Sequence, residues 1–262
     1  MEITPLGDSA FIVRLRETFE DAPDEALGQV MRAFHRLEQA AIPGVIELAP
    51  AYTSVAIFFD PVAVARANPA VTDKMASLMT KIRDVLESGR NRRSTASKPH
   101  IVEIPVCYDP EFAIDLDQVA QHAQLSGREV IDLHSGGEYR VSCIGFTPGF
   151  PFLSGMPAKL ATPRRATPRK EIPAGAVGIG GAQTGIYPLQ SPGGWNLIGR
   201  TPLRLFDSKQ NPPALLRAGD RVRFRRITHE EFYVAAAGAS RTGIVTDSKS
   251  ADEEIGSDKL PE

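Results

Sequence analysis

The chain has 262 residues, of which 42% are hydrophobic and 24% charged, a composition typical of a soluble globular protein with a buried core. This length favours two domains. The net charge of −2 excludes a general electrostatic attraction to nucleic acid or to an anionic membrane. No apolar run approaches the roughly 18–20 residues that cross a bilayer, and the start MEITPLGDSAFIVRL does not resemble a secretory signal. We therefore expect a cytoplasmic protein in which Cys107 and Cys143 are buried free thiols.

The N-terminal third mixes strand and helix signals. Residues 10–15 and 52–59 (YTSVAIFF) are rich in β-branched and aromatic residues, as strands are. Apolar residues recur at helical spacing along 27–41, which predicts an amphipathic helix, and a second helix is predicted over about 71–86. We expect residues 1–89 to form a small α+β domain, with both helices packed on one face of a sheet.

A polar, basic stretch without periodicity, GRNRRSTASKP, comes next. We interpret its residues 90–99 as an exposed linker, with a functional basic patch as the alternative. Residues 100–240 are predicted to form a second domain, which starts with the strand HIVEIPVCY. The polar, charged residues 241–262 are predicted to be a disordered tail.

Two helices are predicted early in the second domain. Asp115 with Gln118 resembles a helix start, and Ser126 with Glu129 has the spacing of a capping box. The second helix is predicted to end at HSGG, with glycine in the usual stop position. Since a positive imidazole is favoured at a helix C-terminus, we interpret His134 as a cap; general acid–base work is the alternative.

Helical periodicity vanishes from residue 145 to residue 227. Short apolar runs such as AVGIG, LRLF and RVRFRRI lie between Gly and Pro turns, which predicts a β-barrel or a β-sandwich. Within this region, residues 145–200 hold 11 of the 22 glycines. Glycine permits positive φ and proline fixes φ, so GFTPGFPFLSGMP indicates a preorganised backbone rather than a flexible linker. We predict a pocket wall or an interface with another chain at Phe146, Pro148, Gly149, Phe150 and Trp195.

Positive charge is concentrated in the same region. Between Tyr139 and Phe206 there are eight basic residues and one acid, a net charge of +7. Arg164, Arg165 and Arg169, in ATPRRATPRK, are held between prolines. This pattern predicts a site for an anionic ligand such as a carboxylate or a phosphate. An ordinary basic face and a docking surface for an acidic partner are the alternatives.

Several familiar chemistries are excluded. GIGGAQTG lacks the lysine of a P-loop and the spacing of a dinucleotide fingerprint, and no GxSxG elbow is present. The five histidines are scattered without metal-ligand spacing, so no metal site is assigned. No catalytic residue can be named, which indicates a chain that holds only part of an active site.

Three long stretches carry a resemblance: HSGGEYRVSCIGFTPGFPFLSGMP, ATPRRATPRKEIPAGAVGIGGAQTGIYPLQSPGGWNLIGRTPLRLFD and LLRAGDRVRF. They resemble the signature of the family of 5-oxoprolinase B subunits, also described as allophanate hydrolase subunit 1 or KipI-like. The resemblance is dense over residues 100–227 and loose over the first 90. It implies an α+β N-terminal domain followed by a mainly-β, cyclophilin-like barrel domain, with the C and A subunits of 5-oxoprolinase as partners.

The activity that this resemblance implies is the ATP-dependent conversion of 5-oxo-L-proline to L-glutamate. The B and C subunits together phosphorylate the lactam, so the enzyme is an ATP-hydrolysing hydrolase that is active only as a complex. Two relatives of different function are the alternatives: a component of urea carboxylase or allophanate hydrolase, and a KipI-like inhibitor of a histidine kinase.

The resemblance also implies roles for residues. Phosphoryl transfer needs cations and backbone N–H donors more than a nucleophile on the protein. The arginines 164, 165 and 169 are candidates for binding phosphate or the substrate carboxylate. The remaining binding candidates are four glycines and three polar side chains: Gly180, Gly181, Gly193, Gly194, Gln183, Thr184 and Tyr187. ATP is the expected cofactor, with Mg²⁺ ligands that this chain does not identify.

Overall fold

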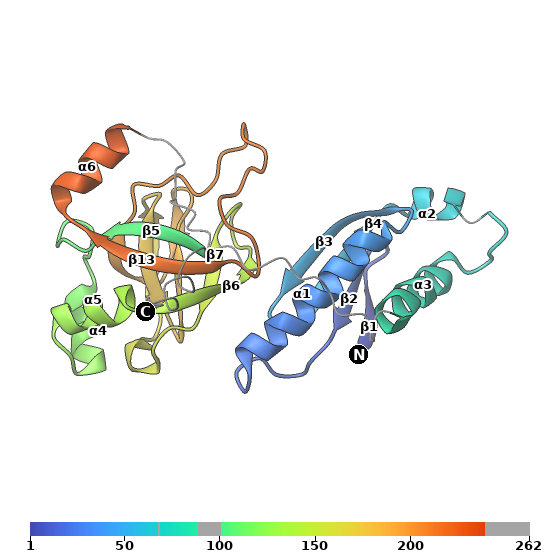
Figure 1. The fold of residues 1–262 in the computed structure, drawn as a ribbon, viewed down its shortest axis with the longest axis horizontal. Helices are drawn as coiled ribbons and strands as arrows, with labels where there is room; N and C mark the ends of the chain where they lie inside the picture. Colours follow the sequence, from blue (N-terminus) through green and yellow to red (C-terminus); the bar gives the residue numbers. More distant parts are fainter. Residues whose placement is uncertain (68, 89–100, 239–262) are drawn as a thin grey trace, which may run out of the picture.

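The computed structural model describes residues 1–67, 69–88 and 101–238. The predicted linker at 90–99 and the predicted tail at 241–262 lie outside these residues. Figure 1 shows two lobes: a barrel that carries α4, α5 and α6, and a smaller sheet that carries α1, α2 and α3.

The strands of the large sheet are β1 (Glu2–Leu6), β2 (Ala10–Arg14), β3 (Val45–Ala51), β4 (Ser54–Phe59), β5 (Ile101–Cys107), β6 (Glu138–Ile144), β7 (Pro151–Ser154), β9 (Ala176–Gly180), β10 (Gln183–Ile186), β12 (Asn196–Arg200) and β13 (Arg221–Ile227). A separate two-stranded sheet consists of β8 (Arg169–Ile172) and β11 (Ser191–Gly193). The helices are α1 (Pro23–Ala40), α2 (Pro61–Ala67), α3 (Lys74–Ser88), α4 (Leu116–Ala123), α5 (Gly127–Ser135), the short 3₁₀ helix η1 (Ala158–Leu160) and α6 (His229–Ala237).

The large sheet has eleven strands in the order β1-β2-β4-β3-β6-β13-β5-β12-β9-β10-β7. Its last strand also pairs with β6, so the seven strands from β6 to β7 close into a barrel. The barrel is mixed, because β13 runs parallel to β5 and the other neighbours are antiparallel. The prediction of a barrel is confirmed; the cyclophilin likeness and the division into two domains stay predictions.

The first lobe buries one apolar stripe from each of two helices. Val30, Ala33 and Leu37 of α1 and Leu78 and Ile82 of α3 share a core cluster with strands β2 and β4. This matches the predicted amphipathic stripes, since residues three and four apart lie on one helix face. The second helix starts three residues later than predicted, at Lys74, and the short helix α2 was not predicted.

The barrel core follows the two-residue period of strands. In β5, Val102, Ile104 and Val106 are buried and belong to one cluster with residues of β6, β9 and β13. Val119 of α4 and Val130 of α5 join the same cluster, so these two helices cover the barrel core.

Helix α5 confirms its predicted start. Ser126 and Glu129 form the capping box, and Gly136 is the C-cap residue. The role predicted for His134 is wrong: this side chain is fully buried, and burial lowers its pKa to about 3, so the imidazole is neutral. The Tyr108 hydroxyl lies 2.8 Å from Nδ1 and the Thr184 hydroxyl 3.0 Å from Nε2.

Helix α6 was missed from the sequence, although its start is a second capping box, Thr228 with Glu231. Only Phe232 of this helix is buried, in a cluster with Cys107, Phe112 and Ile227 of the barrel lobe. A helix that buries a single large residue has little amphipathic pattern, which is why periodicity did not detect it.

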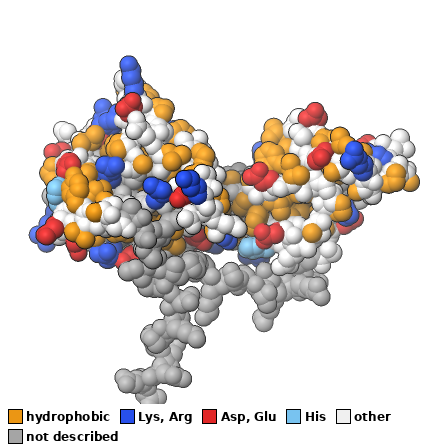
Figure 2. Space-filling view, turned by 90° about the horizontal axis from the view of Figure 1, so that it is seen from above, with side chains coloured by type: hydrophobic (Ala, Val, Ile, Leu, Met, Phe, Trp, Pro, Cys, Tyr) orange, Lys and Arg blue, Asp and Glu red, His pale blue; other side chains and the backbone are white. Residues whose placement is uncertain are grey.

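The two lobes are joined by one sheet contact and a few side chains. Ala51 at the end of β3 pairs with Cys143 of β6, and the Tyr52 N–H donates to the Ser142 carbonyl at 3.1 Å. Gln183 Nε2 donates to the Tyr52 hydroxyl at 3.0 Å. Figure 2 shows a notch between the lobes. Within the described ranges, no helix combines the length and the apolar character that a membrane crossing requires.

Candidate functional site

The arginine segment, residues 162–170, lies against the barrel in an extended form. Thr162 and Gly181 exchange backbone hydrogen bonds of 3.1 and 2.8 Å. The Arg165 N–H donates to the Gly194 carbonyl at 2.7 Å, and the Asn196 amide donates to the Pro163 carbonyl at 2.9 Å. The segment is therefore anchored along its length to the β9–β10 turn and to the start of β12.

Asp115, the N-cap residue of α4, binds two of the three candidate arginines. Its Oδ1 accepts from Arg165 Nη1 at 2.9 Å and from Arg169 Nη2 at 2.7 Å. Its Oδ2 accepts from Arg169 Nη1 at 2.9 Å and from the Leu197 N–H at 2.7 Å. Asp115 is 4% exposed, against 30% and 22% for the two arginine side chains. These bonds fix the arginine segment to α4 and β12.

This finding changes the charge argument from the sequence. The net charge of +7 was counted along a continuous stretch, but the counter-charge comes from Asp115, 50 residues before Arg165. Bidentate pairing with a carboxylate engages the guanidinium of Arg169. In this state the Arg165 and Arg169 side chains stabilise the fold through Asp115. Arg164 is the one of the three candidates whose exposed side chain remains available to an anion.

Arg164 is exposed and has a different environment. Its guanidinium carbon lies 5.8 Å from the centre of the Trp195 ring, a cation–π contact. Its positive charge acts to lower the pKa of both Tyr52 and Tyr187, although burial has the larger effect and raises both pKa values. Arg164 thus lies over Trp195, and its charge acts on a tyrosine of each lobe.

These rings form what we call the aromatic cluster: Tyr52, Phe146, Phe150, Phe152, Tyr187 and Trp195. Phe150 is at its centre, with ring centroids 5.2 Å from Tyr187 and 5.5 Å from Trp195, both edge-to-face. Tyr52 of the first lobe reaches Phe152 at 6.5 Å. Phe150, Tyr187 and Trp195 are buried and Tyr52 and Phe152 are half-buried, so these five rings form an apolar floor rather than a free surface.

Phe146 is the exception, because it is 61% exposed. Its backbone has a φ of +66°, in the left-handed region that aromatic residues rarely adopt. Gly149 in the same loop has a φ of +81°, and a Cβ there would lie 2.9 Å from Phe206. Pro148 is exposed. The loop therefore holds one large ring out toward solvent in a strained conformation.

The candidate glycines serve packing and backbone pairing. A Cβ at Gly180 would lie 2.6 Å from the Trp195 ring, and one at Gly193 would lie 2.4 Å from the Tyr187 hydroxyl. The Gly181 N–H is engaged by Thr162, and the Gly194 carbonyl accepts from the arginine segment. Free backbone N–H groups that could bind a phosphate were predicted for these four residues. The Gly181 N–H is not free, because it donates to the Thr162 carbonyl.

The three polar candidates differ in burial. Gln183 is half-buried and binds Tyr52, whereas Thr184 is fully buried and donates to the Gly178 carbonyl. Tyr187 is buried, and its hydroxyl oxygen accepts a hydrogen bond from the backbone N–H of Trp195. Burial raises the pKa of the Cys143 thiol as well as those of the two tyrosines, so these groups stay protonated near neutral pH. The site can bind and orient an anion, but these residues supply no base.

The sequence missed Asp115 as an arginine partner and Tyr52 as a cluster member. Asp115 was recognised only as a helix start, since spacing along the chain carries no signal for a contact 50 residues away. Across residues 1–67, 69–88 and 101–238, no group of three or more His, Cys, Asp or Glu side chains is placed to hold a metal ion.

Comparison with known proteins gives one family match and three similar proteins. A family model described as the carboxyltransferase domain, subdomain C and D, matches residues 1–216. A protein of Bacillus subtilis (strain 168) that is named as the B subunit of 5-oxoprolinase is 45% identical over 238 residues, which cover 88% of this chain and 95% of that protein. The crystal structure of TTHA0988 is 38% identical with a TM-score of 0.67; the match covers 83% of this chain and 40% of that longer chain. The urea amidolyase of K. lactis, at 20% identity and a TM-score of 0.68, shares the fold over 90% of this chain and 15% of its own.

Proposed function

Because the chain belongs to the family of 5-oxoprolinase B subunits, within the carboxyltransferase domain family, we propose that it is a component of an ATP-dependent 5-oxoprolinase. The observation that carries the proposal is the match to a protein of that name over 95% of the relative's length. The enzyme is a hetero-oligomer of this chain with the C and A subunits, and it opens 5-oxo-L-proline to L-glutamate. Less than half of the TTHA0988 chain matches, which agrees with a protein that works beside further polypeptide.

In this proposal the chain binds and orients the substrate, and the reactive groups come from ATP and the partner subunits. A lactam is a poor electrophile, and transfer of the γ-phosphoryl group to its oxygen yields ADP and turns that oxygen into a leaving group. Water then adds to the ring carbon and the ring C–N bond breaks, which gives γ-glutamyl phosphate, and a second water hydrolyses this acyl phosphate to L-glutamate and phosphate. Such a transfer needs a positioned cation at the developing charge. Arg164 is the candidate of this chain, because it is exposed and stands over the apolar floor of Trp195.

Arg164→Ala tests this role in the complex reconstituted with the A and C subunits. We expect ADP release that depends on 5-oxoproline to fall at least about tenfold, the range of a lost charge-assisted hydrogen bond. Arg128→Ala is the matched control, since Arg128 is 83% exposed on α5 and pairs with Asp132 four residues along the same helix. Its turnover is expected to equal that of the unmodified complex.

Two outcomes would overturn parts of the proposal. Full turnover by Arg164→Ala in an assembled complex removes this residue from the site. An assembled complex whose ADP release is not stimulated by 5-oxoproline removes the activity itself. Stimulation by urea instead would then favour the urea carboxylase alternative, in line with the fold shared with urea amidolyase.

A further inference from the structure

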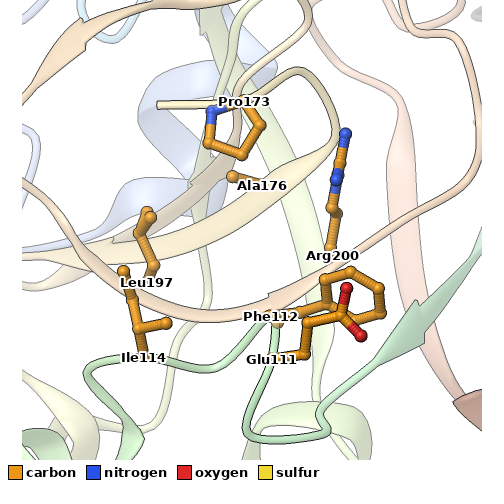
Figure 3. A pocket seen from close by; sticks show the side chains of 8 residues that line it. Glu111, Phe112, Ile114, Pro173, Ala176, Leu197 and Arg200 are labelled. Atoms are coloured by element: carbon orange, nitrogen blue, oxygen red, sulfur yellow. The ribbon is translucent and has the colours of Figure 1, made fainter. Parts of the chain in front are cut away.

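A second hollow lies on the barrel lobe, outside the aromatic cluster. It has a volume of about 130 Å³, and its wall includes Glu111, Phe112, Ile114, Leu197 and Arg200. Figure 3 shows Ile114 and Leu197 on one side, Glu111 and Phe112 below, and Arg200 on the opposite side. A buried cavity of about 150 Å³ holds one benzene ring, so this hollow has room for a single small ring.

Arg200 supplies the positive charge of this pocket in a fixed position. Its Nε donates to the Ala174 carbonyl at 2.9 Å. Its guanidinium carbon lies 5.8 Å from the Phe112 ring centre and 5.9 Å from that of Phe232. Among the residues that the structure describes, none accepts a hydrogen bond from its terminal nitrogens. A guanidinium held in this way can bind a carboxylate through two parallel hydrogen bonds without losing further side-chain freedom.

Glu111 supplies an acceptor at the same pocket. Its Oε2 lies 2.7 Å from His229 Nε2, and its Oε1 accepts from the Tyr233 hydroxyl at 2.9 Å. Hydrogen bonds from these two residues of α6, together with the charge of Arg200, lower the pKa of the Glu111 carboxyl. It remains a carboxylate near neutral pH and can accept one N–H from a ligand.

We infer that this pocket binds a small ring that carries one carboxylate and one ring N–H, the chemical class of 5-oxoproline. The carboxylate pairs with Arg200, the ring lies against Phe112, Ile114 and Leu197, and the ring N–H faces Glu111. The choice of 5-oxoproline as the occupant rests on the proposed function, whereas the charge and size of the pocket do not.

The pocket wall is connected to the arginine segment. Ile114 directly precedes Asp115 in the chain, and the Leu197 N–H donates to the Asp115 carboxylate. A ligand that packs on both side chains therefore touches the residues that hold Arg165 and Arg169 in place.

The test is a titration of the isolated full-length protein with 5-oxo-L-proline, followed by ligand-observed NMR. We expect 2-pyrrolidinone, which lacks the carboxylate, and cyclopentanecarboxylate, which lacks the N–H, each to bind at least about tenfold more weakly. Arg200→Gln should weaken 5-oxo-L-proline binding at least about tenfold. Arg204→Gln is the control, because that side chain is 66% exposed and pairs with Asp207; it should bind as the unmodified protein does.

A second variant guards against a loss of fold, since Arg200 also contacts two rings. Ile114 is 55% exposed, so Ile114→Asp adds a negative charge at the pocket with little cost to the core. Binding should be lost, whereas Val62→Asp, an equally exposed change on α2, should leave it intact. Unchanged binding in both pocket variants, or no binding of 5-oxo-L-proline by the unmodified protein, overturns the inference. If the isolated protein bound 5-oxo-L-proline but the complex showed no 5-oxoproline-dependent turnover, the pocket would be supported and the proposed activity would be rejected.

Discussion

Asp115 organises the candidate site through contacts with residues far from it in the chain, which no local sequence pattern predicts. Four hydrogen bonds converge on one carboxylate that is 4% exposed, three from two arginines of one segment and one from the backbone of β12. A buried carboxylate is tolerated when its lone pairs are all satisfied, and removal of one partner leaves a charge that is costly to bury. The arginine segment is therefore rigid because of its ion pairs as well as its prolines.

His134 gives a pH-dependent prediction at the residue scale. Its pKa is about 3 in the folded protein and about 6.5 in an unfolded chain, so the unfolded state binds the proton more readily. The stabilisation is complete above pH 6.5 and is lost as the pH falls toward 3. From pH 7 to pH 5 the free energy of unfolding should fall by about 2 kcal/mol from this group alone.

Denaturant unfolding at the two pH values measures this loss. His134→Gln keeps a donor and an acceptor but does not titrate, so its loss between pH 7 and pH 5 should be smaller by about 2 kcal/mol. His122→Gln, an exposed change on α4, should retain the full dependence. Equal pH dependence in all three proteins would contradict a neutral buried imidazole.

Single residues could be predicted where their chemistry is local. The Ser126–Glu129 capping box was correct because both partners lie within one helical turn. His134 was misread because its position at a helix end was visible in the sequence, while its burial beneath Tyr108 and Thr184 depends on the closed barrel. The partner of Arg165 was missed for the same reason, since Asp115 comes from another element.

At the scale of elements, the loop that contains Phe146 combines strain with exposure. A left-handed conformation costs a non-glycine residue roughly 1–2 kcal/mol, and glycine avoids this cost. Phe146→Ala and Phe146→Gly remove the same ring contacts, so the glycine variant should be more stable by about 1 kcal/mol. Thermal or denaturant unfolding of the two variants checks the difference.

The control for this pair is Leu189, an exposed residue that does not have a positive φ. There Leu189→Ala should be at least as stable as Leu189→Gly, because glycine gains no relief and loses more backbone entropy. If alanine were also the more stable choice at Phe146, the loop would not be strained. Confirmed strain would indicate that the exposed ring is maintained for a contact with a ligand or a partner protein.

Elements with strong periodicity were predictable, and those held by a single contact were not. The stripes of α1 and α3 and the alternation in β5 fixed their types and approximate positions. Helix α6 buries only Phe232 and helix α2 buries only Val64, so neither sequence shows a helical repeat of apolar residues. The barrel closes through the neighbouring strands β6 and β7, but β13 pairs with β5, 120 residues before it, and that pairing follows only from the assembled sheet.

At the scale of the whole molecule, the eleven-stranded sheet extends through both lobes. Within the described residues, the strands of the two lobes pair at a single position. Ala51 and Cys143 form that pair, and Tyr52 supports it through its hydroxyl contact with Gln183 and its edge-to-face contact with Phe19 at 5.1 Å. Because Tyr52 of the first lobe packs against Phe152 in the aromatic cluster beneath Arg164, the geometry of the candidate site depends on this joint.

Cys143 reports on this joint, because its thiol is partly accessible whereas that of Cys107 is fully buried. In a Cys107→Ser background, Tyr52→Gly suits the backbone φ of +45° but removes the ring contacts and one hydrogen bond. Together these are worth about 1.4 kcal/mol or more, so modification of Cys143 by a thiol reagent should become at least about tenfold faster. Ile46→Ala, at the exposed far end of β3, should leave the rate unchanged. An unchanged rate in Tyr52→Gly would mean that the lobes are held together without this residue, and that the aromatic cluster does not depend on their joint.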